Sequence, residues 1–306
     1  MRTDFTDYLC RAHSVGKIMG GVPKPLTKTQ KETLENWYPR LKGEGKPLTD
    51  NQIKTLAGIM EKRDAKVALS DGAKKYLKEL HSDEVWGRTK EIESKYLDKG
   101  IIAEEQGISL YTEYSGRLYV KNKTRKENEY FSGECDINNS SEYIDDIKCS
   151  WDFDTFPAVE DKVTNTDYIW QGNAYCDLYG KERFRIVYCL VDTPFELIES
   201  ELVRLHYKHN LFDGNGSIME DRIPFVVEKL KKHLFSEKSL KEFCQQSPNV
   251  QFEWFEDNFI PMPVWARVKI FEFEKDEKKL DQAREMVVLA RQYMNNLSAE
   301  MADKIK

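Results

Sequence analysis

The chain has 306 residues, 40% of them hydrophobic, with a net charge of −6 at pH 7 and a mean hydropathy of −0.67. These values fit a folded protein with a sizeable core, and the lack of any apolar run of about eighteen residues argues against a membrane-spanning helix. The acidic balance argues against a protein that binds nucleic acid through overall positive charge. The first residues contain acids and lack the apolar core of a signal peptide, so we expect a cytoplasmic protein.

The charge is unevenly distributed along the chain. Residues 1–99 hold 20 basic and 15 acidic side chains, whereas residues 100–306 hold 27 and 38. A basic front suits a phosphate backbone and an acidic body suits a metal site, although uneven surface helices would give the same difference. The six cysteines are scattered without a CxxC pair, which predicts reduced core thiols and no zinc or iron–sulfur site.

The amino-terminal part of the chain, residues 1–85, has the pattern of a helical region packed on a later core. Apolar side chains recur at helical spacing in three segments, which are residues 27–42, 49–69 and 70–80. A loop rich in glycine and proline precedes them. Beside this loop lie Arg11, Ser14 and Lys17, which are candidates for binding a substrate phosphate or are ordinary surface residues.

The rest of the chain, residues 86–306, alternates helices with strands. We expect helices at residues 86–110, 167–180, 194–209, 218–244 and 276–297, and strands at residues 117–121, 183–192 and 265–274. A β-hairpin is expected over residues 130–151, with its turn at residues 138–141. Gly100 interrupts the first of these helices at a cost of about 1 kcal/mol, which suggests close approach of another backbone. The pattern predicts an α/β (α+β) fold with a mixed sheet.

The expected hairpin carries the most informative polar residues. Asp146 and Lys148 are two apart on its second strand and therefore project from one face, while Asp136 closes its first strand. Two acids and a lysine suit a divalent cation beside a water molecule, as Mg²⁺-assisted phosphodiester hydrolysis requires. The alternative is a solvated strand face, because the same acid–lysine spacing recurs at Asp276 and Lys278. The apolar pattern of the second strand favours the functional interpretation, since charges buried there need partners.

Two helices could add to this group. Gln171 and Tyr175 are four apart on one helical face, with Tyr168 one turn earlier, and they suit contact with a phosphate or a base. An ordinary amphipathic helix would show the same pattern. Glu104 would supply a further carboxylate if it faces the hairpin, and would otherwise be a solvated glutamate.

Taken in order, these residues form a series of four motifs, namely Gly100-x3-Glu104, Asp136, Asp146-x-Lys148 and Gln171-x3-Tyr175. The series resembles the PD-(D/E)xK nuclease superfamily, and the Gln/Tyr helix resembles its RecB and λ exonuclease branches. The segment RAHSVGKIM and the closing stretch that begins RVKIFEFE are similar to YqaJ-like phage recombination exonucleases. No GxxxxGK[ST] or GxSxG motif is present, so nucleotide-driven and serine-hydrolase chemistry lack support.

The resemblance implies a fold and a role for each matching residue. The fold would be a restriction-endonuclease-like core with a mixed central sheet flanked by helices, a helical amino-terminal region and a carboxyl-terminal helix. Mg²⁺ or Mn²⁺ would be held by Asp136, Asp146, the Ile147 carbonyl and Glu104. Lys148 would orient and activate the attacking water, and Gln171 and Tyr175 would position the nucleotide. The sequence departs from the family pattern in two places: Asp146 stands where glutamate is commoner, and Cys135 replaces the proline before Asp136. Glu134 is a reserve ligand.

The implied activity is a Mg²⁺-dependent DNA exonuclease that digests one strand of duplex DNA and leaves a single-stranded tail for recombination. Duplex DNA and a single-strand annealing protein would be its partners, in a bacterial cytoplasm and with a phage or prophage origin. Related exonucleases form rings, so a homo-oligomer is compatible with the resemblance. The alternatives are a structure-specific or nicking endonuclease on the same fold and a non-catalytic DNA-binding protein. The presence of Glu104, Asp136, Asp146 and Lys148 disfavours the last.

Overall fold

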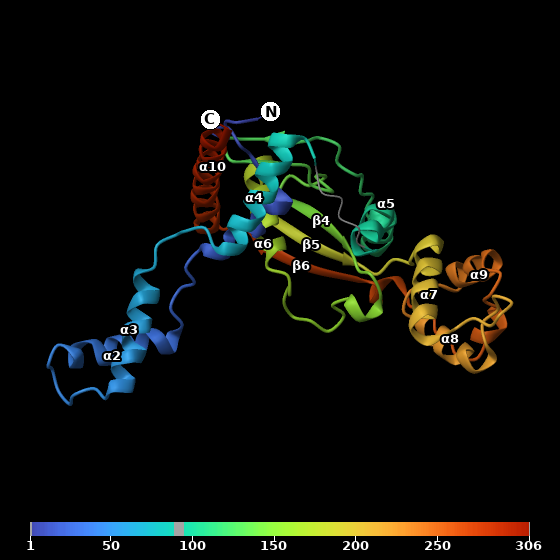
Figure 1. Ribbon diagram of the computed structural model, residues 1–306. Coiled ribbons are helices and arrows are strands. Elements are labelled where there is room, and N and C mark those ends of the chain that lie inside the picture. The colour runs from blue at the N-terminus through green and yellow to red at the C-terminus, as the bar shows by residue number, and fades with distance from the viewer. Residues whose placement is uncertain (1, 89–94, 306) are drawn as a thin grey trace. The chain divides into compact units, whose positions relative to one another are not determined.

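The computed structural model describes residues 2–88 and 95–305, and the chain divides into two compact units (Figure 1). The first unit consists of Met1–Thr89, Glu129–Phe131 and Glu277–Lys306, and the second of Lys90–Asn128 and Ser132–Asp276. The predicted fold class is confirmed: a mixed sheet flanked by helices, with a helical amino-terminal region and a carboxyl-terminal helix. The sequence places that last helix with residues 86–306, but it groups with the amino-terminal helices. No helix of the described residues is long and apolar enough to cross a membrane.

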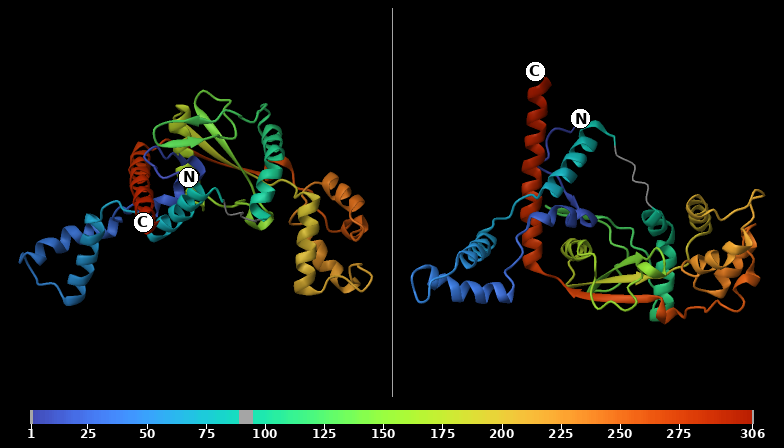
Figure 2. Two further views of the ribbon diagram at one scale, coloured as in Figure 1. Left: turned by 45° about the horizontal axis from the view of Figure 1, so that its top comes forward. Right: turned by 60° about the horizontal axis from the view of Figure 1, so that its bottom comes forward.

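Helices form most of the first unit. Its elements are β1 (Cys10–Arg11), α1 (Val15–Ile18), α2 (Lys28–Leu41), α3 (Asp50–Asp64), α4 (Asp71–Trp86) and α10 (Glu277–Ile305). α10 packs on α4 and α1. α2 and α3 begin with capping boxes at Thr27 and Thr49, as the Thr49–Gln52 spacing predicts. They pack on each other as a hairpin that extends away from the rest of this unit in both views of Figure 2.

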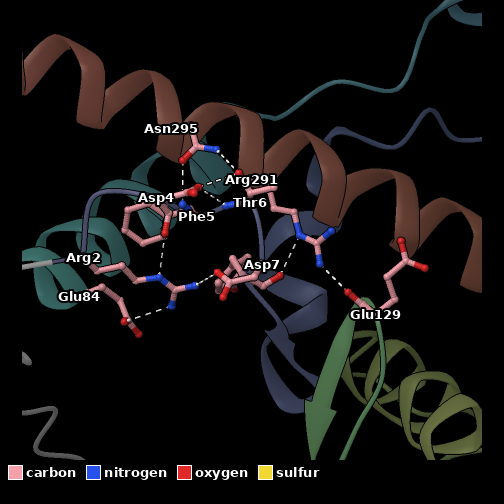
Figure 3. A network of polar contacts seen from close by, with 10 residues as sticks. Arg2, Asp4, Phe5, Thr6, Asp7, Glu84, Glu129, Arg291 and Asn295 are labelled. Atoms are coloured by element: carbon pink, nitrogen blue, oxygen red, sulfur yellow. Dashed lines mark hydrogen bonds and ion pairs between the residues drawn. The ribbon is translucent and has the colours of Figure 1, made fainter.

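Polar contacts attach the first residues of the chain to α10 (Figure 3). The Phe5 N–H donates to Asn295 Oδ1 at 2.8 Å, and Arg291 Nε donates to the Tyr8 carbonyl at 2.9 Å. Arg291 also donates to the Glu129 carbonyl at 2.5 Å. The two chain ends and residues 129–131 are therefore parts of one packed unit.

The second unit is built on a three-stranded sheet in the order β4, β5, β6. β4 (Tyr143–Cys149) runs parallel to the central strand β5 (Arg183–Cys189), and β6 (Val268–Glu274) runs antiparallel to it. The predicted central strand at residues 183–192 and the predicted strand at residues 265–274 are thus confirmed. A smaller sheet has the strand order β1, β3, β2, in which β2 (Lys126–Glu127) pairs antiparallel with β3 (Phe131–Gly133).

Two helices, α5 (Lys95–Ser115) and α6 (Asp167–Tyr179), pack on opposite faces of this sheet. Alternate residues of β5 separate the two cores: Val187 and Cys189 join the α5 side, and Ile186 and Tyr188 join the α6 side. Glycines permit both close approaches. A Cβ at Gly107 of α5 would lie 2.9 Å from the Cys149 Sγ, and a Cβ at Gly172 of α6 would lie 2.1 Å from the Phe184 ring.

A helical group with a hydrophobic core of its own is inserted between β5 and β6. It contains α7 (Phe195–His209), α8 (Ile223–Leu230) and α9 (Glu237–Gln246), which Figure 1 shows gathered beyond the ends of the two strands. The prediction of one helix over residues 218–244 is wrong. Ser236 accepts a hydrogen bond from the Ser239 N–H and starts a new helix there, as an N-cap serine does.

Further expectations are corrected by the structure. Residues 117–121 form no strand, because the Tyr119 ring stacks on Tyr111 of α5 at 4.4 Å and folds this segment back onto that helix. The hairpin expected over residues 130–151 is reduced to a single antiparallel bridge between Ile137 and Asp145. Gly100 does not face another backbone, since a Cβ there would meet nothing within 4 Å. The predicted helix start at residue 86 is also wrong, because Trp86 ends α4 and Gly87 caps that helix in the left-handed region; residues 89–94 of the predicted helix lie outside the described residues.

A buried lysine joins α5 to the ends of two strands. The Lys99 side chain is fully buried, and its Nζ donates to the carbonyls of Trp151 and Val191 and to Thr193 Oγ1 at 2.8–2.9 Å. Trp151 lies two residues beyond the end of β4, and Val191 lies two residues beyond the end of β5. Burial lowers the Lys99 pKa to about 8, and these three acceptors satisfy the hydrogen bonds that a buried amine requires.

Candidate active site

The candidate site lies on the α6 side of β4. Asp146 and Lys148 project from this face of the strand, as their spacing predicts, and Asp145 projects from the other face and pairs with Arg185. Lys148 Nζ lies 2.7 Å from Asp146 Oδ2. The Asp146 side chain is only 3% exposed and that of Lys148 20%. A nearly buried ion pair thus reaches solvent on its lysine side.

Gln171 of α6 contacts both members of this pair. Its Nε2 donates to Asp146 Oδ1 at 3.2 Å, and its Oε1 accepts from Lys148 Nζ at 3.2 Å. Gly172, the next residue, lets α6 approach the sheet closely enough for these contacts. Tyr175 lies one turn later, accepts from Gln171 Nε2 at 3.3 Å and donates to the Glu134 carbonyl at 2.9 Å. The amide therefore fixes the distance and orientation of the two charged groups.

Asp136 lies at the outer edge of β4, although β3 ends three residues before it. Its Oδ2 accepts the Ile147 N–H at 2.6 Å, so the carboxylate takes the position that a neighbouring strand's carbonyl would occupy. This contact explains why the hairpin pairing stops after a single bridge. Burial raises the Asp136 pKa to about 8 and the Asp146 charge adds to the effect, while Lys148 and the Ile147 N–H act against it.

Glu104 lies on α5 near this edge, with Lys121 as its partner. Lys121 Nζ lies 3.1 Å from Glu104 Oε1, and this hydrogen bond raises the Lys121 pKa, with a smaller contribution from Asp136. The Glu104 charge in turn contributes to the raised pKa of Asp136. Within residues 2–88 and 95–305, no three His, Cys, Asp or Glu side chains are gathered closely enough to form a metal-binding group. Glu104 thus lies near Asp136 and is paired with a lysine.

The donor atoms at this edge have the chemistry that Mg²⁺ prefers. Asp146 Oδ2 is buried and accepts no hydrogen bond of good geometry from the described residues, although Lys148 lies beside it. The N–H and C=O of one strand residue point to the same edge of the strand, so the Ile147 carbonyl points to the edge where its N–H meets Asp136. Two carboxylates and a carbonyl are hard oxygen ligands, and the residues present fit a divalent cation.

The other predicted site residues belong to both units. In the first unit, Arg11 and Lys17 are exposed and Ser14 is buried; Lys17 Nζ lies 5.0 Å from the centre of the Tyr76 ring. In the second unit the Glu134 side chain is exposed, and its backbone carbonyl holds Tyr175. The roles proposed for these residues stay predictions.

Two neighbours of the site lie outside the four sequence motifs. Lys121, the partner of Glu104, closes the segment that the sequence wrongly predicts as a strand, and no spacing points to it. Tyr168 lies one turn before Gln171, and Lys148 Nζ lies 4.5 Å from the centre of its ring. The three-residue spacing on α6 places it on the face of Gln171 in the sequence, but no spacing indicates its contact with Lys148.

A cavity of about 600 Å³ lies elsewhere in the second unit, next to α5, α7 and α9. Its lining includes acidic side chains and apolar ones, among them Glu105, Glu242, Leu110 and Phe243. None of Asp136, Asp146 and Lys148 lines it. The cavity is therefore separate from the candidate site.

Comparison with known proteins identifies a fold. The chain is similar to the crystal structure of a phage-related exonuclease from Haemophilus somnus 129PT, with a TM-score of 0.58, 23% sequence identity and coverage of 96% of this chain and 97% of that chain. The chain is also similar to an alkaline exonuclease (LHK-Exo) from Laribacter hongkongensis, with a TM-score of 0.45, and to LHK-Exo in complex with dAMP, with a TM-score of 0.46. In both comparisons the sequence identity is 12%, and the match covers 77% of this chain and 86% of the other. No protein-family model and no curated protein matches the chain. The first likeness extends over nearly the full length of both chains and is a likeness of the whole fold.

Proposed function

We propose that this protein is a Mg²⁺-dependent DNA exonuclease that hydrolyses one strand of duplex DNA. The observation that carries the proposal is the contact set of Gln171, which holds the Asp146 carboxylate and the Lys148 ammonium side by side on β4. The fold shared with a phage-related exonuclease supports it. The single-stranded tail left by such digestion would be a substrate for a strand-annealing protein in recombination.

Asp136, Asp146, the Ile147 carbonyl and Glu104 would hold the metal ion, Mg²⁺ or Mn²⁺. When bound, the ion would supply Lewis-acid stabilisation of the phosphate and a water of lowered pKa. The charge of Asp146 disfavours ionisation of Asp136 in the metal-free protein, and a cation between the two groups would remove that penalty. Glu104 would exchange its pairing with Lys121 for the metal or for a metal-bound water.

Lys148 would hold the attacking water and stabilise negative charge on the phosphate. Burial lowers the pKa of its ammonium, but Asp146 and Asp136 together raise it above the ordinary value. The group therefore stays charged near neutral pH and acts as a hydrogen-bond donor. Gln171 keeps it beside Asp146, and Tyr175 keeps Gln171 in place. Water orientation and charge stabilisation are the two tasks that phosphodiester hydrolysis requires of the protein.

The proposal is tested with linear and covalently closed circular duplex DNA, each with Mg²⁺ or with a chelator. We expect digestion of the linear duplex only, and only with the metal. Lys148→Ala and Asp146→Asn should reduce the rate by at least about 1000-fold while each variant remains folded. Cleavage of the closed circle would replace the proposal with an endonuclease. Digestion at the parent rate by either variant would refute the site.

A further inference from the structure

The Lys148 ammonium is held on three sides. Asp146 Oδ2 lies 2.7 Å away and Gln171 Oε1 lies 3.2 Å away. The third contact is aromatic, since the centre of the Tyr168 ring lies 4.5 Å from Nζ. An ammonium within about 6 Å of a tyrosine ring face is attracted by the ring's quadrupole. The ring thus adds a third restraint to the end of a long and flexible side chain.

The Tyr168 ring is itself held by neighbouring aromatic side chains. It lies 6.3 Å from the Tyr188 ring, measured between centroids, and Tyr188 packs edge-on against Phe271 of β6 at 5.9 Å. Tyr188 is also the register partner of Lys148 on β5. The ring that meets the ammonium is thus supported by the sheet that carries the lysine. Tyr168 and Gln171 lie one turn apart on α6, so one helix supplies two of the three restraints.

We propose that Tyr168 is a positioning residue that holds the Lys148 ammonium toward the reacting phosphate through its ring face. The proposal rests on the proposed nuclease function for the role of Lys148. The ring face makes the contact and the phenol hydroxyl is not required, so phenylalanine should replace tyrosine. Leucine would fill much of the same volume but has no quadrupole to attract the cation. The pair Tyr168→Phe and Tyr168→Leu therefore separates the ring's charge distribution from its bulk.

The kinetic test measures digestion of linear duplex DNA by both variants at saturating Mg²⁺. Tyr168→Phe should keep kcat within about twofold, and Tyr168→Leu should lower kcat by about 5- to 30-fold with KM nearly unchanged. Tyr207→Leu is the matched control, because Tyr207 of α7 is 86% exposed. If Phe and Leu reduce kcat equally, the hydroxyl matters and the proposal is wrong. A raised KM with normal kcat would make Tyr168 a substrate-binding residue and would also overturn it.

A second measurement does not depend on DNA cleavage. In protein labelled with ¹³C at lysine Cε, the Lys148 signal is identified by its absence from Lys148→Arg, and the ring above it should shift this signal upfield. The shift should persist in Tyr168→Phe and vanish in Tyr168→Leu, while melting temperatures report whether either variant is unfolded. An unshifted signal in the parent protein would refute the contact. A signal that behaves as expected in a protein that cleaves no DNA would refute the nuclease function instead.

Discussion

The backbone N–H of Ile147 donates to Asp136 Oδ2 at 2.6 Å and fixes this carboxylate against the open edge of β4. A residue outside any regular strand thereby gains a defined position beside a buried second acid, Asp146. The arrangement places two carboxylates close together, and burial and the Asp146 charge raise the Asp136 pKa to about 8. In the absence of a cation, the site therefore destabilises the fold.

Asp136→Asn should stabilise the metal-free protein. The folded-state pKa of Asp136 lies above its unfolded value, so folding favours the protonated carboxyl. The stability that this carboxyl contributes is therefore fully present below about pH 4 and is lost as pH rises through about 8. Asparagine keeps an oxygen for the Ile147 N–H and has no charge. We expect a gain of about 1–3 kcal/mol at pH 8, less than the full shift because Asp136 is partly exposed.

Urea unfolding with a chelator at pH 4 and pH 8 measures this gain, which should be small at pH 4. Mg²⁺ should stabilise the parent protein and leave Asp136→Asn nearly unaffected, because a ligand that binds only the folded state raises its stability. A variant that is less stable than the parent at pH 8 would contradict the raised pKa.

Gln171→Ala should lower kcat by about 10- to 100-fold without unfolding the protein. The substitution removes the donor to Asp146 and the acceptor for Lys148, so the two charged groups lose their shared restraint while both remain present. The check is kcat on linear duplex DNA together with the melting temperature. Gln106→Ala on α5 is the matched control, because Gln106 is exposed. Equal activity of the two variants would show that Gln171 has no positioning role.

The sequence predicted the same-face placement of Asp146 and Lys148 because side-chain alternation in a strand is a local property. It also predicted that Gln171 and Tyr175 share a helical face. It failed at the expected hairpin, where the Asp136 carboxylate replaces a strand partner. It also failed at Gly100, where we expected close approach of another backbone. The glycine of α5 that makes the close helix–sheet contact is Gly107. Both errors concern contacts between distant segments, which no local pattern records.

Lys121→Met should increase the affinity of the site for Mg²⁺. The Lys121 ammonium is 3.1 Å from Glu104 and close enough to Asp136 for the two charges to interact. A bound cation would have to compete with this ammonium for Glu104, and methionine has a similar length without the charge. We expect the Mg²⁺ concentration for half-maximal activity, or for half-maximal thermal stabilisation, to fall by about 3- to 10-fold. Lys123→Met, at an exposed lysine two residues later, is the control. A higher requirement for Mg²⁺ in Lys121→Met would mean that Lys121 assists metal binding.

Gly172→Ala should destabilise the protein strongly, whereas Gly100→Ala should stabilise it. A Cβ at Gly172 would lie 2.1–2.6 Å from three atoms of the Phe184 ring, so α6 must move away from β5 or the buried ring must shift. We expect a loss of about 2–4 kcal/mol in the free energy of unfolding. Since Gln171 moves with α6, the loss of activity should be larger than the unfolded fraction explains.

Gly100 lies in α5, where an added Cβ would meet nothing within 4 Å, and alanine there should add about 0.5–1 kcal/mol to the free energy of unfolding. Urea unfolding of both variants measures the difference, and a neutral Gly172→Ala would show that the packing of α6 on β5 is looser than these distances require.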